Sequence, residues 1–542
     1  MNLKELMTGF RTLLRPESAY IKKIYVYALY IGILSLILPL GIQATITLLE
    51  ARTFSTSWIV LSIIVASGIA AGGILQVNQL KVIENLQQKI FIRKAFFLTE
   101  KISRLNYQFL GQNDPKELMN RFFDVTAIQK SITKVLISFS TALVQVILGL
   151  TLLSIYHPLF IGFSLIVLIL MFYILRYTSR KGIATSLEES DHKYEIAFWI
   201  QESTSIFTSF KLSPKSTLHL DHLNNKAEKY LEARNNHFRI LKQQYTVLIV
   251  FKVLIVLFFL IVGGALVINQ QINLGQFVAS EIIILLLINS VEKINENIDT
   301  VYDLFTSVKK VEKITNLPED SQSVGMNVAD ELHIQINNVC IADNLGNDRL
   351  TNFSFEIKPG DFTYVVGNNV VNQLFRSLFE EDVLREGNIS INQVPLNNID
   401  QLQLRERVGF VDQRERVFSG SLLDNLTLGI RDYNSATFNE LLKVLEIDKY
   451  VGTLPLGFDQ RLLPNDPNVP TYIKERIVLF RNLLNEPELL LITDFLNHSK
   501  TKNKIKVLDY LRNSEAFKTV LINQPKNDLE EYEYFTDKIV IK

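Results

Sequence analysis

Long stretches without a charged side chain alternate with charged segments in the first half of the chain. Residues 24–49 and 53–80 contain no Asp, Glu, Lys or Arg, and each is longer than the roughly 20 residues that a helix needs to cross a bilayer. The uncharged run 135–175 is about twice that length. It is interrupted at His157-Pro158, which favours two helices joined by a tight turn. These three runs predict four membrane-spanning helices.

Two further apolar segments contain one charge each. Lys252 lies in residues 245–268 and Glu281 in residues 277–291. Charges at bilayer depth are rare and often functional, so both residues are candidates for a functional role. A structural reading exists for each: Lys252 extends its ammonium to the cytoplasmic interface, and Glu281 caps the outer end of a short last span. The pattern predicts six spans in all, near residues 24–49, 55–80, 135–156, 158–175, 245–268 and 277–291.

The basic residues predict the orientation of the spans, because Lys and Arg stay on the cytoplasmic side. Residues 81–134 contain ten of them, whereas the short turns at 156–159 and 269–276 contain none. The N-terminal segment 1–20, both long loops and everything after the last span are therefore expected in the cytoplasm. A signal peptide is not expected, because the first apolar run is too long and five more follow it.

The pattern changes in the second half of the chain. A charged helical extension, 292–315, ends the membrane domain (21–316), and a polar linker follows at 317–330. From residue 331 onward, short strands such as LHIQINNV, FSFEI and FTYVVG alternate with helical patterns, which is typical of an α/β domain. The predicted fold is an all-α domain of six membrane helices followed by an α/β domain over residues 331–542.

Composition and charge exclude several classes of function. The chain has 56 basic and 56 acidic residues, and this zero net charge gives no support for a nucleic-acid partner. The single cysteine, Cys340, excludes an internal disulfide and a cysteine-based metal site. His219 and His222 in HLDHL are spaced like two metal ligands on a helix, but no further ligand stands near them, so no metal site is predicted.

Three stretches of the membrane half carry a family resemblance: FLGQNDPKELMNRFFDVTAIQKSI (109–132), FKLSPKSTLHLDHLNNKAEKYLEARNNHFRILKQQY (210–245) and LGQFVASEIIILLLINSVEKI (274–294). They resemble the coupling regions and last span of bacterial type I secretion and bacteriocin-export transporters. Over nearly its whole length the chain resembles an ABC exporter half-transporter. The resemblance implies a nucleotide-binding domain after the spans, a multi-pass location in the bacterial inner membrane, and a dimer. No peptidase domain precedes the first span, so the peptide-processing subclass is not expected.

The second half departs from this family at its phosphate loop. The motif GxxxxGK[ST] cradles phosphates with backbone N–H groups, places a Lys on the β- and γ-phosphates and holds Mg²⁺ with a hydroxyl. Here the motif falls on Gly367, Asn372, Gln373 and Leu374, and only the first glycine is retained. Asn372 tolerates a positive φ. Gln373 is neutral and Leu374 cannot ligate a metal, so two charge-assisted contacts, each worth about 1.5–3 kcal/mol, are predicted to be lost.

Other elements that the resemblance implies also depart from the family pattern. The stretch 408–429 resembles the Q-loop region, with Gln413 in the glutamine position. Thr493 and Asp494 stand where an Asp that supports Mg²⁺ and a Glu that positions water are implied, although a one-residue slip would make Asp494 the metal-supporting group. Gln524 stands near the place of the switch histidine. The signature LSGGQ corresponds to Val469, Pro470, Thr471, Tyr472 and Ile473.

We therefore expect a degenerate nucleotide-binding domain that neither binds Mg-ATP tightly nor hydrolyses it, in a non-catalytic subunit of an export or type I secretion-like system. The expected partners are the lipid bilayer, a second copy of the chain or another ABC half-transporter, and a membrane-fusion adaptor. Two alternatives stay open: an active ATP-coupled exporter half that works as a heterodimer, and a membrane scaffold that transports nothing.

Overall fold

The computed structural model divides into two compact units, one of Met1–Leu105 with Asn113–Pro318 and one that contains Glu319–Lys542. The structure describes residues 10, 12, 14–50, 56–105, 120, 122–319, 325–328, 331–342, 348–367, 369–378, 384–412, 416–464, 466–515, 517–524, 532 and 535–541.

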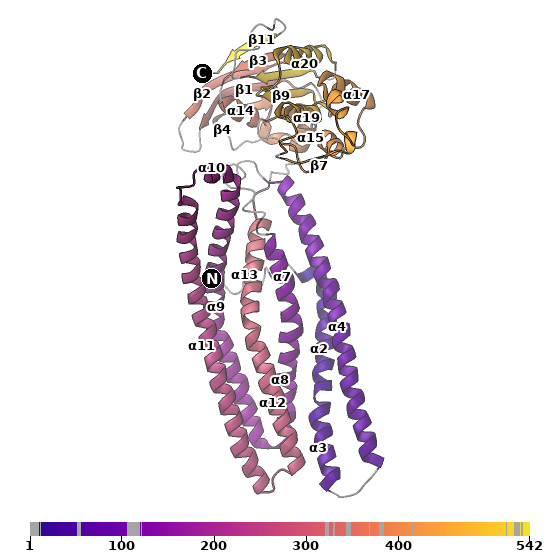
Figure 1. Ribbon diagram of the computed structural model, residues 1–542, viewed down its shortest axis with the longest axis vertical. Helices are drawn as coiled ribbons and strands as arrows, with labels where there is room; N and C mark the ends of the chain where they lie inside the picture. The colour runs from indigo at the N-terminus through magenta and orange to yellow at the C-terminus, as the bar shows by residue number, and fades with distance from the viewer. Residues whose placement is uncertain are drawn as a thin grey trace. The chain divides into compact units, whose positions relative to one another are not determined.

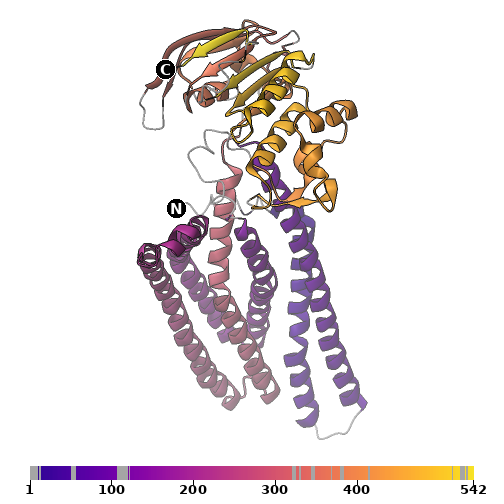
Figure 2. The same ribbon diagram turned by 45° about the horizontal axis from the view of Figure 1, so that its top comes forward.

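Every named element of the first unit is a helix. These elements are η1 (Arg15–Glu17), α2 (Ser18–Ser35), α3 (Ile37–Glu50), α4 (Thr56–Ser103), α7 (Phe123–Lys134), the π-helical turn η2 (Val135–Phe139), α8 (Ser140–Tyr156), α9 (Pro158–Ser205), α10 (Phe207–Leu212), α11 (Leu218–Ile268), α12 (Leu274–Glu296) and α13 (Ile298–Thr315). Figures 1 and 2 show α2 beside α4, α9 beside α11 and α7 beside α13, and the helices of each pair are in contact.

Several helices of the first unit contain long apolar runs. Among the described residues, five helical segments are long and apolar enough to cross a membrane, and a sixth, shorter apolar helix, Pro158–Tyr173, begins α9. Several helices continue beyond their apolar part. At 1.5 Å per residue the 48 residues of α4 are about 70 Å long, more than twice the thickness of a hydrocarbon core. Roughly half of such a helix therefore lies outside the bilayer.

Local sequence explains where two of the spans begin. Pro158 starts α9, a position where its missing N–H costs nothing, and the preceding His157 accepts a hydrogen bond at Nδ1 from the Leu159 amide (3.2 Å). Asn273 and Gln276 form a capping box at the start of α12, with amide-to-side-chain distances of 2.7 and 2.9 Å. Glu281 lies about two turns inside α12, so it does not cap this helix.

The second unit alternates strands and helices. Its elements are β1 (Ile334–Ala342), β2 (Asp348–Ile357), β3 (Phe362–Val366), α14 (Asn369–Arg376), β4 (Leu384–Ile391), β5 (Val394–Pro395), η4 (Leu396–Asn398), α15 (Gln401–Arg407), β6 (Val408–Val411), β7 (Gly420–Ser421), α16 (Leu422–Thr427), α17 (Ser435–Val444), α18 (Ile447–Val451), η5 (Gly457–Asp459), β8 (Arg461–Leu462), α19 (Thr471–Leu483), β9 (Leu489–Thr493), α20 (Thr501–Asn513), β10 (Thr519–Asn523) and β11 (Asp537–Val540).

A parallel sheet forms the centre of this unit. Its strand order is β11-β3-β10-β9-β6, and an antiparallel sheet has the order β2-β1-β4-β5. All residues of β9 and β10 are buried, as in a parallel sheet that is covered on both faces. Because parallel strands end at the same edge, the residues that follow β3, β6, β9 and β10 come together there. The prediction of a helical membrane domain followed by an α/β domain is confirmed.

Gly182 of α9 lies against the buried ring of Tyr302 of α13. A Cβ at Gly182 would stand 2.3 Å from a ring carbon, and the ring has little freedom to move because Gln244 donates to the Tyr302 hydroxyl at 2.7 Å. We expect Gly182→Ala to lower the stability of the first unit by about 1–3 kcal/mol through overpacking. Thermal unfolding of the full chain in detergent measures this effect.

Gly264→Ala of α11 is the matched control, because nothing lies within 4 Å of a Cβ at that position. Alanine also favours a helix interior over glycine by about 0.8–1.0 kcal/mol. The control should therefore be neutral or stabilising. Equal melting temperatures for the two variants would contradict the close packing of α9 on α13.

Candidate functional site

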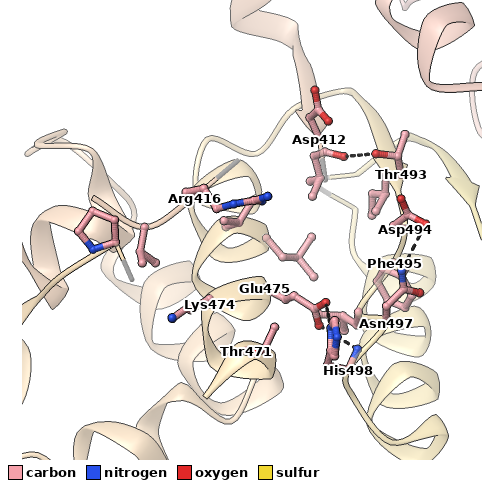
Figure 3. Close-up of a pocket in the computed structure, with 17 residues that line it drawn as sticks. Asp412, Arg416, Thr471, Lys474, Glu475, Thr493, Asp494, Phe495, Asn497 and His498 are labelled. Carbon is pink, nitrogen blue, oxygen red and sulfur yellow. Dashed lines mark hydrogen bonds and ion pairs between the residues drawn. The ribbon is translucent and has the colours of Figure 1, made fainter. Parts of the chain in front are cut away.

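A cavity of about 600 Å³ opens in the second unit at the ends of β6 and β9 (Figure 3). Its polar lining comes from three segments of the chain. They supply Asp412 and Arg416 after β6, Thr471, Lys474 and Glu475 from the first turns of α19, and Thr493, Asp494, Asn497 and His498 from the end of β9 onward. The lining combines carboxylates with basic side chains, so the cavity does not present charge of a single sign.

The end of β9 carries two of the residues predicted from sequence. Thr493 is buried, and its Oγ1 donates to the Val411 carbonyl at 3.0 Å, which ties β9 to β6. Asp494 has φ +52°; its amide donates to the Asn523 carbonyl at 3.0 Å, and its Oδ1 accepts from Asn497 Nδ2 at 3.3 Å. The Thr493 hydroxyl is therefore used inside the sheet, whereas Asp494 presents its carboxylate to the cavity.

The charged side chains of α19 that line the cavity are bonded to other segments. Glu475 accepts a hydrogen bond from the His498 amide at 3.1 Å, and its Oε1 lies 2.6 Å from His498 Nδ1 (Figure 3). Lys474 Nζ donates to the Asp466 carbonyl at 3.0 Å. These bonds fix the first turns of α19 and occupy a carboxylate and an ammonium that would otherwise face a ligand.

The helix α14 follows β3, as the phosphate-loop resemblance predicts, but its residues serve the core. A Cβ on Gly367 would stand 2.6 Å from Val371 Cγ2 and 3.1 Å from the Ile541 carbonyl oxygen, so packing alone requires glycine there. Leu374 and Val371 are buried in the apolar core of this unit, and Gln373 is half-buried. The side chain of Leu374 thus has an apolar structural role.

Asp412 binds α14 through its carboxylate. It forms an ion pair with the Arg376 guanidinium, and it accepts a hydrogen bond from Asn372 Nδ2 at 3.4 Å. The paired side chains of Arg376 and Asp412 are only 16% and 10% exposed, so the ion pair stabilises two charges that lie largely out of water. The pair joins α14 to the segment after β6. Gln413, the predicted Q-loop glutamine, lies outside the described residues.

The five signature positions lie at the start of α19. Pro470 is the N-cap residue and Thr471 the first helical residue. Val469 and Ile473 are buried in the core. Tyr472 is 39% exposed, and its ring lies 5.1 Å from the guanidinium carbon of Arg476. Of the five positions, Thr471 and Tyr472 are the exposed ones.

Arg476 also anchors α19 to the preceding helices. Its Nη1 lies 3.2 Å from Glu446 Oε2, and Lys449 Nζ donates to Glu446 Oε1 at 2.5 Å. The hydrogen bond from Lys449 and the charge of Arg476 hold the pKa of the Glu446 carboxyl below its ordinary value. Because the folded-state pKa is the lower one, this stabilisation is present at neutral pH and is lost as the pH falls through the folded-state pKa.

The two charges predicted at bilayer depth differ in their surroundings. Lys252 Nζ lies 2.6 Å from Glu292 Oε1, and both residues line a small cavity between α11 and α12. Lys252 is therefore paired with the neighbouring helix, whereas the sequence suggested an ammonium that extends to the interface. Glu281 is exposed on α12.

The described residues contain no group of three His, Cys, Asp or Glu side chains that could hold a metal ion. The spaced histidines take part in packing: the ring of His222 lies 4.8 Å from that of Trp199, and His219 lies 4.9 Å from Phe210. Their i, i+3 spacing thus serves the contact of α11 with α9 and α10.

Known proteins share this arrangement. Residues 23–291 match the family model of the ABC transporter transmembrane region. A solved structure of a bacterial Atm1-family ABC exporter with ATP bound superposes on 98% of this chain, with 94% of that chain covered, a TM-score of 0.85 and 15% sequence identity. The chain has the fold of an ABC exporter. Its first unit is similar to the ABC transporter transmembrane region over residues 23–291, and the superposition includes the α/β unit as well.

Curated relatives of this ABC-exporter-like chain are named as ABC transporters or transport proteins. The uncharacterized ABC transporter ATP-binding protein YfiB of Bacillus subtilis is 23% identical over 77% of this chain and 73% of its own length. The lactococcin-G-processing and transport ATP-binding protein LagD of Lactococcus lactis is 21% identical over 75% of this chain and 59% of its own length. For the lactococcin-A transport/processing protein LcnC, of the same species, the match covers 35% of its length.

The cavity of this ABC-exporter-like chain brings together Thr471, Thr493 and Asp494 out of the residues predicted from sequence. The pair Arg376–Asp412 was missed, although a signal for it exists. Two strands end at the same sheet edge, and each is followed by a charged residue of opposite sign. Arg376 lies within the helix NVVNQLFR, and Asp412 stands directly before Gln413. Sequence reasoning compared these stretches with a nucleotide site and did not consider contacts between them.

We expect Asp412→Asn to destabilise the second unit of this ABC-exporter-like chain by about 3 kcal/mol, because it removes a carboxylate that pairs with the largely buried Arg376 guanidinium. Chemical denaturation of the full chain, followed by a probe in the second unit, measures the change. Glu406→Gln on α15 is the control, since Glu406 is exposed and its loss of charge should cost little. Equal effects of the two substitutions would show that the ion pair does not hold α14.

Proposed function

We propose that the chain is a non-catalytic subunit of an export or type I secretion-like system, and that its second unit does not work as an ATPase. One observation carries this proposal. Leu374, at the position of the phosphate-loop hydroxyl, is buried in the apolar core of the unit. A hydroxyl there would hold Mg²⁺. An aliphatic side chain offers the metal no ligand, and its burial gives the position a different role.

The neighbouring residues also fit Mg-ATP poorly. Gln373, at the lysine position, brings no positive charge to the β- and γ-phosphates. The Thr493 hydroxyl already donates to Val411, and Asp412 is neutralised by Arg376. Asp494 presents a carboxylate to the cavity, but by itself it supplies a single ligand group for a metal. No step of ATP hydrolysis is therefore assigned to these residues.

The signature positions, which would contact an ATP bound by the partner domain, support the same proposal. In the exporter family each ATP lies between the phosphate loop of one domain and the signature of its partner. Pro470 has no backbone N–H to offer a phosphate, and Val469 and Ile473 are core residues. A dimer of two copies would have two altered sites, and a heterodimer would have one altered face in each.

The names of LagD and LcnC, which are lactococcin transport and processing proteins, favour transport of a lactococcin-like substrate as the task of the proposed assembly. ABC exporters typically act as dimers in a membrane. We infer that the partner is a second copy or another ABC half-transporter, with a membrane-fusion adaptor as a further component. The alternative of an active half needs the partner to supply the hydrolysis machinery of both sites.

The purified chain is expected not to bind Mg-ATP at micromolar concentrations and not to hydrolyse it. Two missing charge-assisted contacts lower the affinity by roughly 10²- to 10⁴-fold. Calorimetric titration of the full chain in detergent with Mg-ATP tests the binding, and phosphate release tests the hydrolysis. Micromolar binding, or turnover that Asp494→Asn abolishes, contradicts the proposal.

Gln373→Lys is the gain-of-binding variant of choice, because Gln373 is half-buried and a longer side chain can be accommodated there more readily than at a core position. It should raise the affinity for Mg-ATP without restoring turnover, since the signature and the catalytic Glu are still missing. Leu374→Ser should not be combined with it, because removal of a buried Leu side chain typically lowers the stability of the fold by about 2–5 kcal/mol.

A dimer of this chain should keep the same distance between its two second units with and without nucleotide. A ligand shifts a conformational equilibrium only by its differential affinity for the two states, and here ATP has almost none. Double electron–electron resonance from a label at exposed Lys502→Cys, in a Cys340→Ser background, gives the distance distribution. A shift on addition of Mg-ATP and vanadate would show that a working nucleotide site exists.

A further inference from the structure

A second cavity, of about 250 Å³, lies in the first unit among the charged ends of α7, α9 and α13. It is far larger than the roughly 30 Å³ that one water molecule occupies in the liquid. Figure 1 shows α13 between α9 and α7, and α13 contacts both of these helices. The cavity is independent of the second unit and of its relation to ATP.

One carboxylate in this cavity is incompletely satisfied. Asp124 of α7 is 4% exposed, and its Oδ1 accepts a hydrogen bond from Ser307 Oγ of α13 at 3.2 Å. Its Oδ2 is buried and has no hydrogen-bond partner among the described residues. A buried carboxylate oxygen without a donor costs more than an ordinary hydrogen bond is worth. Asp124 lines the cavity, so a donor bound there would meet this oxygen.

The nearby buried ammonium is already engaged elsewhere. Lys310 Nζ donates to Ser190 Oγ at 2.7 Å, lies 3.2 Å from Asp191 Oδ1, and stands 4.2 Å from the ring centroid of Tyr194. Its hydrogen bonds are thus directed away from Asp124. Lys310 neutralises part of the local charge through space, but it does not satisfy Asp124 Oδ2.

The inner part of the cavity, its floor, is lined by different side chains from its outer part, the rim. Buried hydroxyl groups of Ser131, Ser186, Thr306 and Ser307 line its inner part beside Asp124. Three exposed lysines, Lys130, Lys134 and Lys193, line its outer part. The lining also includes the carboxylates of Glu189, which pairs with Arg234 at 3.0 Å, and of Asp303, which accepts a hydrogen bond from Ser186 at 3.3 Å. A ligand that fits both regions carries a hydrogen-bond-donating cation at its inner end and an anion at its outer end. Since the described residues hold no group of three metal-ligating side chains, an ammonium fits the floor better than a metal ion.

We propose that this cavity binds a small zwitterionic amino compound, whose ammonium donates to Asp124 Oδ2 and whose carboxylate lies among the lysines of the rim. Amino acids and short peptides share this chemistry. The site lies in the cytoplasmic extension of the helices by the orientation predicted from the basic residues, so its ligand comes from the cytoplasm.

Calorimetric titration of the full chain in detergent, without nucleotide, tests the proposal with γ-aminobutyrate, butylamine and butyrate, which share one carbon chain. We expect γ-aminobutyrate to bind, and each one-ended analogue to bind roughly 10- to 100-fold more weakly, the usual cost of one charge-assisted hydrogen bond. No detectable binding of millimolar γ-aminobutyrate, or equal binding of either analogue, overturns the proposal.

Two substitutions test the contacts of the two charged ends of the ligand separately. Asp124→Asn should weaken the binding of γ-aminobutyrate by a similar factor, so that it binds no more tightly than butyrate. Lys193→Gln, at an exposed position that tolerates change, should leave γ-aminobutyrate binding no more tightly than butylamine. Glu188→Gln is the control, because Glu188 is exposed on α9 and does not line the cavity. Unchanged affinity in Lys193→Gln or a folded Asp124→Asn overturns the assignment, whatever the nucleotide experiments show.

Discussion

Lipid tails offer no hydrogen bonds, and this constraint determines how the first unit is built. Each spanning segment satisfies its backbone within a helix, and polar side chains that remain at this depth pair across helices. Tyr156 donates to Gln43 at 2.6 Å, Ser290 donates to Gln145 at 3.1 Å, and Lys252 pairs with Glu292 of the neighbouring helix. Apolar packing fills the space between these points, so the few polar pairs specify which helices are neighbours.

The second unit is held together by the hydrogen bonds and apolar contacts of its parallel sheet. The order of a parallel sheet is held by its backbone ladder and by the apolar side chains on both faces, and neither depends on the residues that would bind a phosphate. Val371 and Leu374 illustrate this, since they pack α14 onto the sheet core at the place where the exporter family binds a nucleotide. Arg376 and Asp412 add an ion pair across the same edge. The domain can therefore keep its fold while the chemistry at its edge changes, which is the situation that we propose for this chain.

The fold followed from the sequence because uncharged runs, Pro158 and the alternation of strands after residue 331 are local signals. The helix extensions were less predictable, since the second half of α4 carries charged residues and its apolar side chains pack on segments that are distant in the sequence. At the candidate site, sequence reasoning placed Thr493 and Asp494 at a strand end, where they lie. It could not determine that Val469 and Ile473 point into the core, or that Glu475 meets His498, because both depend on how α19 is rotated against the sheet.

Two buried carboxylates show how differently this chain treats its charges. Asp412 has a guanidinium and an amide within reach, both from one helix, so its charge is compensated inside the protein and no ligand is needed. Asp124 is buried as deeply, but its Oδ2 has no hydrogen-bond donor among the described residues, and the Lys310 ammonium bonds to other groups. A carboxylate that stays buried at this cost requires a compensating donor. The adjoining cavity gives such a donor space to enter, and this contrast is why the first unit, rather than the cavity of the second unit, is the place to look for a ligand of this protein.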